Sequence, residues 1–368
     1  MKAAEFKKLG DYVKIKTGKL DANASSDDGE YPFFTCSIEP LKISSFSYDC
    51  ECCLVAGNGD LNVKYYNGKF DAYQRTYIIE SLDKEKLDVM YLYFFLCSYI
   101  EVLRKQSIGG VIKYIKLGNL TDALIPIPSL EKQKEICRNL IQARKVLNES
   151  QALLSKYDIL IKSRFIEMFG DPVSNPMGWE TRELESIADI VSGITKGRKT
   201  KETELFEVPY MAVSNVKAGY IDWTTVKTIE ATKAEIAIYQ LKPNDVLMAE
   251  GGDPDKVGRG ALITTVPKNC IHQNHVFRVR LNQLSPIYFS QYLQHEKSKR
   301  YFLSCAKQTT GIASINMTQL KGLPVLIPSE KKQYDFASFV QQIDKSKFEI
   351  WLYLNLCYII EKRVFTYD

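Results

Sequence analysis

One long stretch of the chain has the spacing of apolar residues that is typical of a helix with a single apolar face. It runs from Ser129 to Pro172 without an internal proline, and its apolar residues recur at alternating steps of four and three. Eight of the ten positions in this series are apolar. A heptad pattern kept for more than four heptads predicts a long helix that pairs with another helix, and Ser129 is a good N-cap for it. The ten positions are Ile136, Leu140, Ala143, Leu147, Ser150, Leu154, Tyr157, Ile161, Arg164 and Met168.

The same pattern returns 200 residues further along, near the end of the chain. A helix of about 40 residues is roughly 60 Å long and would expose its apolar stripe if it stood alone. Two such helices most simply bury their stripes against each other, so we predict an antiparallel coiled-coil pair. The residues predicted to pack in it are Ile136, Leu140, Leu147, Leu154 and Ile161 in the first helix, and Phe336, Val340, Ile343, Ile350 and Leu354 in the second.

The residues before each of these helices show a different pattern. Short alternating or β-branched runs, such as Tyr77–Ile79 and Val276–Arg280, are separated by Gly-Asp and Asn-Gly turns. These features are typical of strands joined by tight turns. A helical piece interrupts the strands around Val89–Arg104 and again around Pro286–Ala306. We therefore predict two compact, mostly β domains with a few helices.

The two halves of the chain repeat one another. Four pairs of short segments share their apolar or glycine positions in the same order, at offsets that grow from 175 to 200 residues. Four matches in one order predict a duplicated plan, in which the second copy carries longer loops. The pairs are Leu9–Gly18 with Leu184–Gly193, Tyr31–Phe34 with Val208–Met211, Cys53–Asp60 with Val246–Asp253, and Leu120–Pro128 with Leu320–Pro328.

The segment Phe169–Trp179, with the sequence FGDPVSNPMGW, separates the two copies. Gly170 can end the first long helix, and Pro172 and Pro176 prevent it from resuming. We predict an α+β fold with a pseudo-two-fold internal repeat. Its parts are a mostly β domain at 1–128, a long helix at 129–170, a connecting segment at 171–178, a second mostly β domain at 179–328 and a second long helix at 329–368.

Composition and charge narrow the function only slightly. The chain has 368 residues, and a formal net charge of +5 from 49 basic and 44 acidic side chains, which allows a nucleic-acid partner without requiring one. No signal peptide is recognisable, and the longest apolar stretches are shorter than the roughly 20 residues that cross a bilayer. Nine irregularly spaced cysteines do not form a disulfide framework. We therefore expect a cytoplasmic protein.

Two clusters raise the possibility of a metal site. Cys50, Cys52 and Cys53 lie close together, but adjacent cysteines in a strand point to opposite faces. Cys270, His272 and His275 form the second cluster, for which a strand of mixed polarity is the simpler interpretation. No Asn- or Asp-Pro-Pro-aromatic motif, phosphate-binding glycine loop or nucleophile–histidine arrangement is recognisable. The sequence thus predicts no catalytic, cofactor or metal site in this chain.

One motif occurs in both copies, where the β domain ends and the long helix begins. Ile125–Gln133 reads Ile-Pro-x-Pro-x-x-x-x-Gln, and Val325–Gln333 repeats it without the first proline of the pair. With Met168–Pro172 (MFGDP) and Asn175–Trp179 (NPMGW), this order resembles the specificity (S) subunits of type I restriction–modification systems over essentially the whole chain.

The resemblance implies two target recognition domains, each of which reads one half of a bipartite DNA target. It also implies that the helices set the spacer between the half-sites and dock two methyltransferase (M) subunits. Those partners bind S-adenosylmethionine and methylate adenine at N6, and motor–nuclease (R) subunits can join them. Because the two domains differ, we expect two different half-sites and an asymmetric target.

Candidate DNA contacts are the basic and amide side chains of the predicted loops, because Lys and Arg bind phosphates and Arg, Asn and Gln read base edges. The resemblance assigns no base contact, and for each single residue a solvated surface charge is an equal alternative. A scaffold whose β domains bind something other than DNA is a second hypothesis, and a metal-dependent enzyme at the second cluster is a third. The candidates are Lys64, Lys69, Gln74, Arg75, Lys196, Arg198, Lys199, Lys256, Arg259, Lys307 and Gln308.

Overall fold

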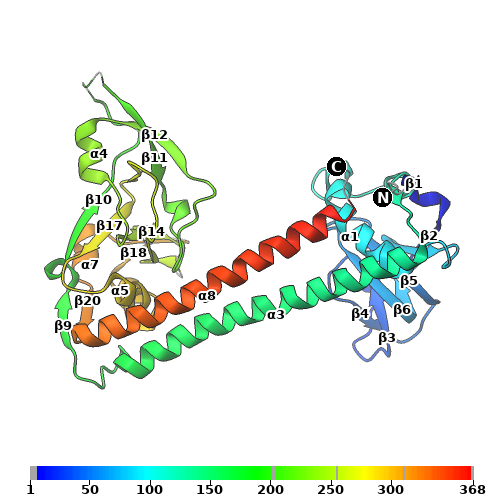
Figure 1. The fold of residues 1–368 in the computed structure, drawn as a ribbon, viewed down its shortest axis with the longest axis horizontal. Helices are drawn as coiled ribbons and strands as arrows, with labels where there is room; N and C mark the ends of the chain where they lie inside the picture. The colour runs from blue at the N-terminus through cyan, green and yellow to red at the C-terminus, as the bar shows by residue number, and fades with distance from the viewer. Residues whose placement is uncertain (1–5, 201, 203, 254–255, 310, 366–368) are drawn as a thin grey trace. The chain divides into compact units, whose positions relative to one another are not determined.

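The structure is a computed structural model that describes residues 6–365 apart from residues 201, 203, 254–255 and 310 (Figure 1). The chain forms two compact units. The first comprises the residues up to Ala152 together with those from Ile350 onward, and the second comprises Leu153–Glu349. Each unit contains one mostly β domain and a part of each long helix. Among the residues that the structure describes, no helix combines the length and apolar content needed to cross a bilayer.

The β domain of the first unit is built on a six-stranded sheet in which only β3 and β6 run parallel. A two-stranded pairing of β1 (Phe6–Lys8) with β8 (Leu124–Pro126) joins its two ends in sequence. Its helices are α1 (Val89–Gln106), α2 (Leu117–Thr121) and the 3-10 turns η1 (Leu9–Asp11) and η2 (Ala22–Ala24). The strand order is β2 (Val13–Thr17), β7 (Thr76–Ser81), β5 (Tyr48–Ala56), β6 (Val63–Ala72), β3 (Tyr31–Phe34) and β4 (Leu41–Ile43).

The alternation of β5 sorts its side chains between two apolar clusters. Cys53 and Val55 belong to the cluster that contains α1 residues, whereas Cys52 and Leu54 pack with Phe70 on the other side of the sheet. Side chains of successive strand residues point to opposite faces, so Cys52 and Cys53 cannot converge on one ion. Burial raises the pKa of Cys52 and Cys53, which keeps both thiols protonated.

The β domain of the second unit is divided into several smaller sheets. Its strands are β9 (Glu180–Glu183), β10 (Ala188–Ser192), β11 (Phe206–Met211), β12 (Lys227–Ala231), β13 (Val246–Ala249), β14 (Gly251–Gly252), β15 (Gly260–Leu262), β16 (Ile271–His272), β17 (Val276–Leu281), β18 (Lys307–Thr309), β19 (Ile312–Ser314) and β20 (Pro324–Ile327). They form sheets ordered β10-β17-β13-β15, β12-β11-β16, β14-β19-β18 and β20-β9. Its helices are α4 (Lys233–Tyr239), α5 (Pro286–Leu293), α6 (Glu296–Cys305), α7 (Met317–Lys321) and the 3-10 turns η3 (Leu184–Ser186) and η4 (Val213–Asn215).

The strand pairings confirm the predicted duplication. The order β2-β7-β5-β6 in the first domain corresponds to β10-β17-β13-β15 in the second. The parallel contact of β3 with the end of β6 corresponds to that of β11 with β16. The single strand β6 is thus replaced by two strands, β15 and β16, with a loop between them. Gly18 and Gly193 also correspond: a Cβ on either would lie 2.1 Å or 2.0 Å from the carbonyl oxygen of Ala72 or His272.

The glutamine of the repeated motif makes two corresponding hydrogen bonds in both copies, and Gln133 makes a third. The Gln133 side chain accepts a hydrogen bond from Asp88 N (2.9 Å) and donates to the carbonyls of Lys86 (2.8 Å) and Pro128 (2.9 Å). Gln333 accepts from Ser285 N (2.8 Å) and donates to Pro328 O (2.7 Å). Both amides are buried. Because they bond to Asp88 N and Ser285 N, they join the start of each long helix to the start of α1 or α5. This contact explains why the motif ends in glutamine.

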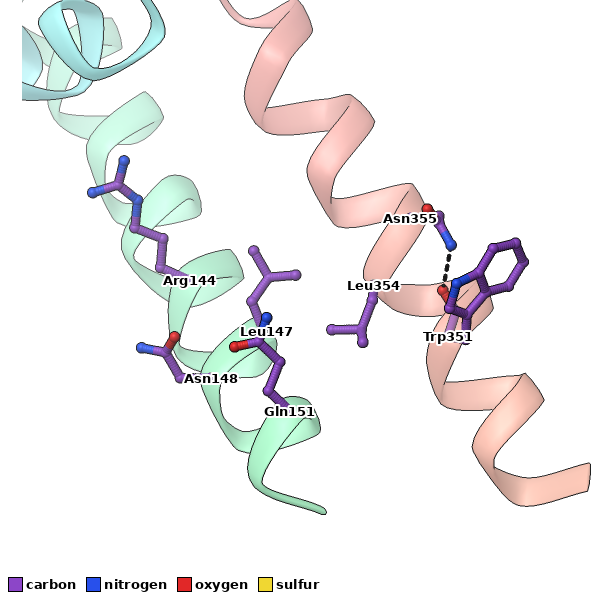
Figure 2. A pocket seen from close by; sticks show the side chains of 7 residues that line it. All are labelled: Arg144, Leu147, Asn148, Gln151, Trp351, Leu354 and Asn355. Carbon is purple, nitrogen blue, oxygen red and sulfur yellow. Dashed lines mark hydrogen bonds between the residues drawn. The ribbon is translucent and has the colours of Figure 1, made fainter. Parts of the chain in front are cut away.

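The long helices are α3 (Leu130–Phe169) and α8 (Glu330–Arg363), coloured green and orange-red in Figure 1. In the second unit their contacts run in opposite directions: Lys332 Nζ donates to Met168 O (2.8 Å), and Lys347 pairs with Asp158. In the first unit, Figure 2 shows Leu147 and Leu354 pointing toward one another from α3 and α8. The helices are therefore antiparallel within each unit, and the predicted α+β fold class is confirmed.

The apolar stripes of α3 and α8 pack against the cores of the β domains as well as against each other. Near the helix ends, Leu140 belongs to the core cluster of the first domain, and Ile161, Phe336 and Val340 belong to that of the second, while Ile136 and Ile343 pack against the same two clusters. The remaining predicted packing residues are only half-buried: Leu147, Leu154, Ile350 and Leu354. A cavity of about 510 Å³, lined partly by polar side chains such as Arg144 and Gln151, lies beside Leu147 and Leu354 (Figure 2).

The segment after α3 ends the helix as its sequence predicts. Gly170 has a positive φ of 75°, and its N–H donates to Ile166 O at 2.8 Å. Pro176 packs so closely that a Cβ on Gly170 would lie 2.6 Å from its Cγ. The Trp179 indole then donates to Phe169 O at 2.9 Å and returns the chain to the end of α3. The glycine, the proline and the tryptophan of this motif therefore act on one turn.

Candidate nucleic-acid interface

Polar loops gather at one end of the four-stranded sheet in the second domain. The register pairs Ser192 with Phe277, Met248 with Phe277 and Met248 with Gly260. The loops that follow β10 and β13, and those that precede β15 and β17, therefore leave the same end of the sheet. Within one of these loops, β14 pairs with β19, which brings the β18–β19 hairpin to the same place. The structure thus brings together seven of the predicted residues: Lys196, Arg198, Lys199, Lys256, Arg259, Lys307 and Gln308.

The first domain presents the corresponding loops at the corresponding end of its sheet. Gln74 and Arg75 form the turn before β7, and Lys64 is the second residue of β6. Lys69 does not join them, because it lies five residues further along β6, roughly 16 Å away at the rise of a strand. Its ammonium group instead lies 4.7 Å from the ring centroid of Phe46. Three of the four predicted residues of this domain therefore share one edge.

Most of the predicted residues are accessible to a large ligand. Lys64 is half-buried and donates to the Asn62 side chain, and burial lowers its pKa. Lys256 pairs with Asp253, and Arg259 is half-buried. The basic loop after β10, residues 195–201, carries Lys196, Arg198 and Lys199, and its last residue, Lys201, lies outside the described residues. The side chains that are exposed at the two edges are Gln74, Arg75, Lys196, Lys199, Lys256, Lys307 and Gln308.

Arg198 has a structural partner that the sequence did not reveal. Its Nε donates to Glu235 Oε1 at 2.6 Å, and its Nη2 contacts Glu235 Oε2 and Glu230 O (3.0 Å). Glu235 also accepts from Thr232 N at 2.9 Å in a capping box at the start of α4. These bonds, led by the guanidinium, lower the pKa of Glu235 to about 2. Arg198 therefore attaches the basic loop to α4 and is not free to contact a phosphate in this arrangement.

Two residues of the same edge, Asn274 and His275, were missed as candidate contacts. His275 Nδ1 lies 2.8 Å from Glu250 Oε2, and Asn274 Nδ2 lies 3.3 Å from His275 Nε2. Asn274 and His275 occupy the turn before β17, as Gln74 and Arg75 occupy the turn before β7. The offset of 200 residues already present in the sequence relates the two pairs and was the signal that could have found them.

The residues considered for a metal site are not arranged as ligands. His272 is buried and its Nδ1 lies 2.8 Å from Val276 O, whereas His275 is exposed and pairs with Glu250. Burial lowers the pKa of His272 to about 4 and raises that of Cys270 to about 12. Within the part of the chain that the structure describes, no three His, Cys, Asp or Glu side chains are grouped to hold a metal ion.

Comparison with known protein families now assigns the fold. The family described as "Type I restriction modification DNA specificity domain" matches residues 1–156 and 176–351, once for each copy of the repeat. The fold is that of a protein with two similar β domains, whose corresponding loops carry different side chains. This chain belongs to the family of type I restriction–modification DNA specificity domains, as the motifs predicted.

Individual relatives agree with this assignment. The type I restriction enzyme EcoDI specificity subunit of Escherichia coli is 38% identical over 154 residues, which are 42% of this chain and 34% of that protein. The EcoKI specificity subunit of Escherichia coli strain K12 is 23% identical over 258 residues, or 67% of this chain and 56% of that protein. The matches thus span between about a third and just over half of these relatives. The crystal structure of an S subunit from M. genitalium has the same fold, with a TM-score of 0.60 at 15% identity over 99% of this chain and 96% of that one.

Proposed function

We propose that this chain is a non-catalytic DNA specificity subunit, whose two β domains each bind one half of a bipartite, asymmetric target. The observation that carries the proposal is the duplicated loop edge. The same scaffold presents Gln74 and Arg75 in one domain and Asn274 and His275 in the other. Both pairs supply an amide, but the second residue is a guanidinium in Arg75 and an imidazole in His275, and this difference favours two different half-sites.

We propose that the long helices set the spacer between the two half-sites. The 40 residues of α3 correspond to a length of roughly 60 Å. We propose the functional division at the predicted boundaries, with target recognition domains at 1–128 and 179–328, helices at 129–170 and 329–368, and a connector at 171–178. The methylation reaction, and the binding of its cofactor S-adenosylmethionine, would then belong to partner methyltransferase subunits in the cytoplasm.

Those partners need a docking surface, and α8 offers one. Four of its large apolar side chains are exposed, namely Phe348 at 61%, Trp351 at 54%, Leu352 at 58% and Tyr353 at 65%. Exposed aromatic residues grouped on one helix are typical of protein-binding surfaces. We propose that M subunits, two per chain, bind the helices and use this surface, and that R subunits join the resulting complex.

The proposal is tested first in the source cells by mapping N6-methyladenine with and without this gene. Deletion should remove methylation from one split, asymmetric motif, which also supplies the duplex for binding experiments. In vitro, Lys196→Glu with Lys199→Glu should weaken binding of the chain and its M subunits to that duplex. Two lost phosphate contacts would reduce the slope of log affinity against log salt by about 1.8.

A matched control uses the opposite end of the same sheet. Lys242 and Lys268 are exposed there, and Lys242→Glu with Lys268→Glu changes the charge equally. Arg198 is left intact, because its loss would also break the contact with Glu235. Equal effects of the two double variants would contradict the assigned edge. Duplex binding without salt dependence, or none at all, would instead favour a scaffold whose β domains bind another ligand.

A further inference from the structure

A cavity of about 540 Å³ in the second unit has an unusually one-sided charge. Five basic side chains line it. They are Lys162 of α3, Lys299 of α6, and Lys217, Lys256 and Arg259 of the loops. Among the described residues, no carboxylate lines this cavity. The five cationic groups come from four separate segments of the chain, so no single helix or loop produces the cluster.

The wall that carries Arg259 has a fixed shape. Gly258 has a φ of 69°, and a Cβ there would lie 2.1 Å from the ring of Phe302. The neighbouring turn is tied to it, because Gly219 N donates to Gly260 O at 3.0 Å. A side chain at position 258 would therefore have to displace a buried aromatic ring. The contacts of this tight turn hold the backbone of Arg259 at the cavity even when no ligand is bound.

Arg259 itself is incompletely bonded. Its Nη2 donates to Val213 O at 3.4 Å, a long contact, and its Nε is buried without a hydrogen-bond partner among the described residues. A buried donor that lacks an acceptor costs free energy, and a guanidinium is best satisfied by an anion with two oxygens. The geometry therefore favours an oxyanion at this wall.

Among the described residues, carboxylates neutralise the cluster only in part. Lys256 pairs with Asp253, and Lys217 contributes to the lowered pKa of Asp222, which is set first by the Thr224 hydroxyl. An adjoining cavity shares Lys162 and contains Asp158 and Asp344, but Asp158 is already paired with Lys347. Like charges brought together repel one another, and a bound anion relieves that repulsion.

The rest of the cavity is apolar and aromatic. Val257, Leu293 and Phe302 form its apolar lining, and the ring of Tyr220, which is 60% exposed, stands at its rim. A ring beside a group of cations suits a ligand that joins a phosphate to a flat base. We propose that this cavity binds a nucleotide, with Lys162, Lys217 and Arg259 on the phosphate and Tyr220 against the base or sugar.

The nucleotide has two possible sources with the same chemistry, namely a free nucleotide or one unit of a bound DNA strand. The second source rests on the function proposed above, and the first does not. Both are tested on the full-length chain, with its M subunits for the duplex. The probes are dAMP, inorganic phosphate and the methylated-motif duplex, each measured by calorimetry over a series of salt concentrations.

The test variant is Lys162→Gln with Lys217→Gln, and the control is Lys156→Gln, an exposed lysine of α3 outside the cavity. For a free nucleotide, we expect dAMP to bind more tightly than phosphate and at least tenfold more weakly in the double variant. Tyr220→Ala should lower dAMP affinity but leave phosphate affinity unchanged. For a DNA nucleotide, dAMP binds to neither protein, and the salt slope for the duplex falls by about 1.8 in the double variant.

The proposal is overturned if a folded double variant matches the wild-type chain with every probe. Circular dichroism establishes that the variant is folded, and Lys162→Arg with Lys217→Arg should restore binding because the charge returns. The function proposed above fails separately, if the wild-type complex does not bind the duplex. In that case the dAMP titration still decides whether the cavity is a nucleotide site.

Discussion

The buried amide of Gln133 allows a quantitative test of how each β domain is joined to its helix. Replacement by leucine keeps a similar volume but removes three hydrogen bonds, at 2.9 Å from Asp88 N and at 2.8 and 2.9 Å to the carbonyls of Lys86 and Pro128. A buried, unpaired N–H costs about 1–3 kcal/mol, and each lost carbonyl contact about 1 kcal/mol. Gln133→Leu should therefore destabilise the first unit by about 3–5 kcal/mol.

The second copy gives an internal comparison. Gln333 makes two such bonds, to Ser285 N at 2.8 Å and Pro328 O at 2.7 Å, so Gln333→Leu should destabilise the second unit by about 2–4 kcal/mol. Glutamate at either position places a carboxylate oxygen against a carbonyl. Its folded-state pKa should be raised, so the lost stability should return in part as pH falls, when the carboxyl can donate.

Hydrogen exchange measured by mass spectrometry on the intact chain separates the two units. Gln133→Leu should lower the protection of α1 and the surrounding strands, and Gln333→Leu that of α5. Gln142→Ala and Gln342→Ala serve as controls, because both side chains are exposed on the same long helices. A change below about 1 kcal/mol, or one spread equally over both units, would refute the assigned role of the amide.

Three further predictions concern separate contacts. Glu235→Gln should lower the free energy of unfolding by about 1–2 kcal/mol at neutral pH, because Arg198 lowers the pKa of Glu235 to about 2. The difference from the wild type is present above pH 4.5 and should shrink as pH falls toward 2, so a constant difference in urea titrations would contradict it. Burial keeps His272 neutral with a pKa of about 4, so its protonation in the unfolded chain should reduce stability as pH falls from about 6.5 to 4. His272→Gln should flatten that part of the pH profile, whereas parallel profiles would exclude this origin. Leu352→Ala with Tyr353→Ala should weaken binding of an M subunit at least tenfold in calorimetry, while the exposed Leu82→Ala should not, and equal affinities would remove α8 as the docking surface.

Much of the fold could be predicted because it depends on patterns of residues that are close together in the sequence. The heptad positions from Ile136 to Met168 identify α3, and Gly170 with Pro176 marks its end. Repeated landmarks gave the duplication, since each domain has the same short segments in the same order. The replacement of β6 by two strands was not predicted, because the two-residue strand β16 is defined by its pairing with β11, which is distant in sequence.

The candidate site was only partly predictable. Basic loops were recognisable, but whether a basic side chain is available depends on its neighbours in space. Arg198 and Glu235 are 37 residues apart, and no sequence pattern pairs them. In the same way, Lys69 lies on the same hairpin as Lys64 in sequence, yet the rise of the strand separates them.

The sequence by itself thus determined the elements, their duplication and the family, because helix periodicity, turn residues and motif order act over short distances along the chain. Only the tertiary structure decided which loops share an edge, which cations are paired, and that Lys162, Lys217, Arg259 and Lys299 line one cavity. The physical reason is that burial and electrostatic pairing depend on distances between residues far apart in sequence, and strand register and helix packing set those distances.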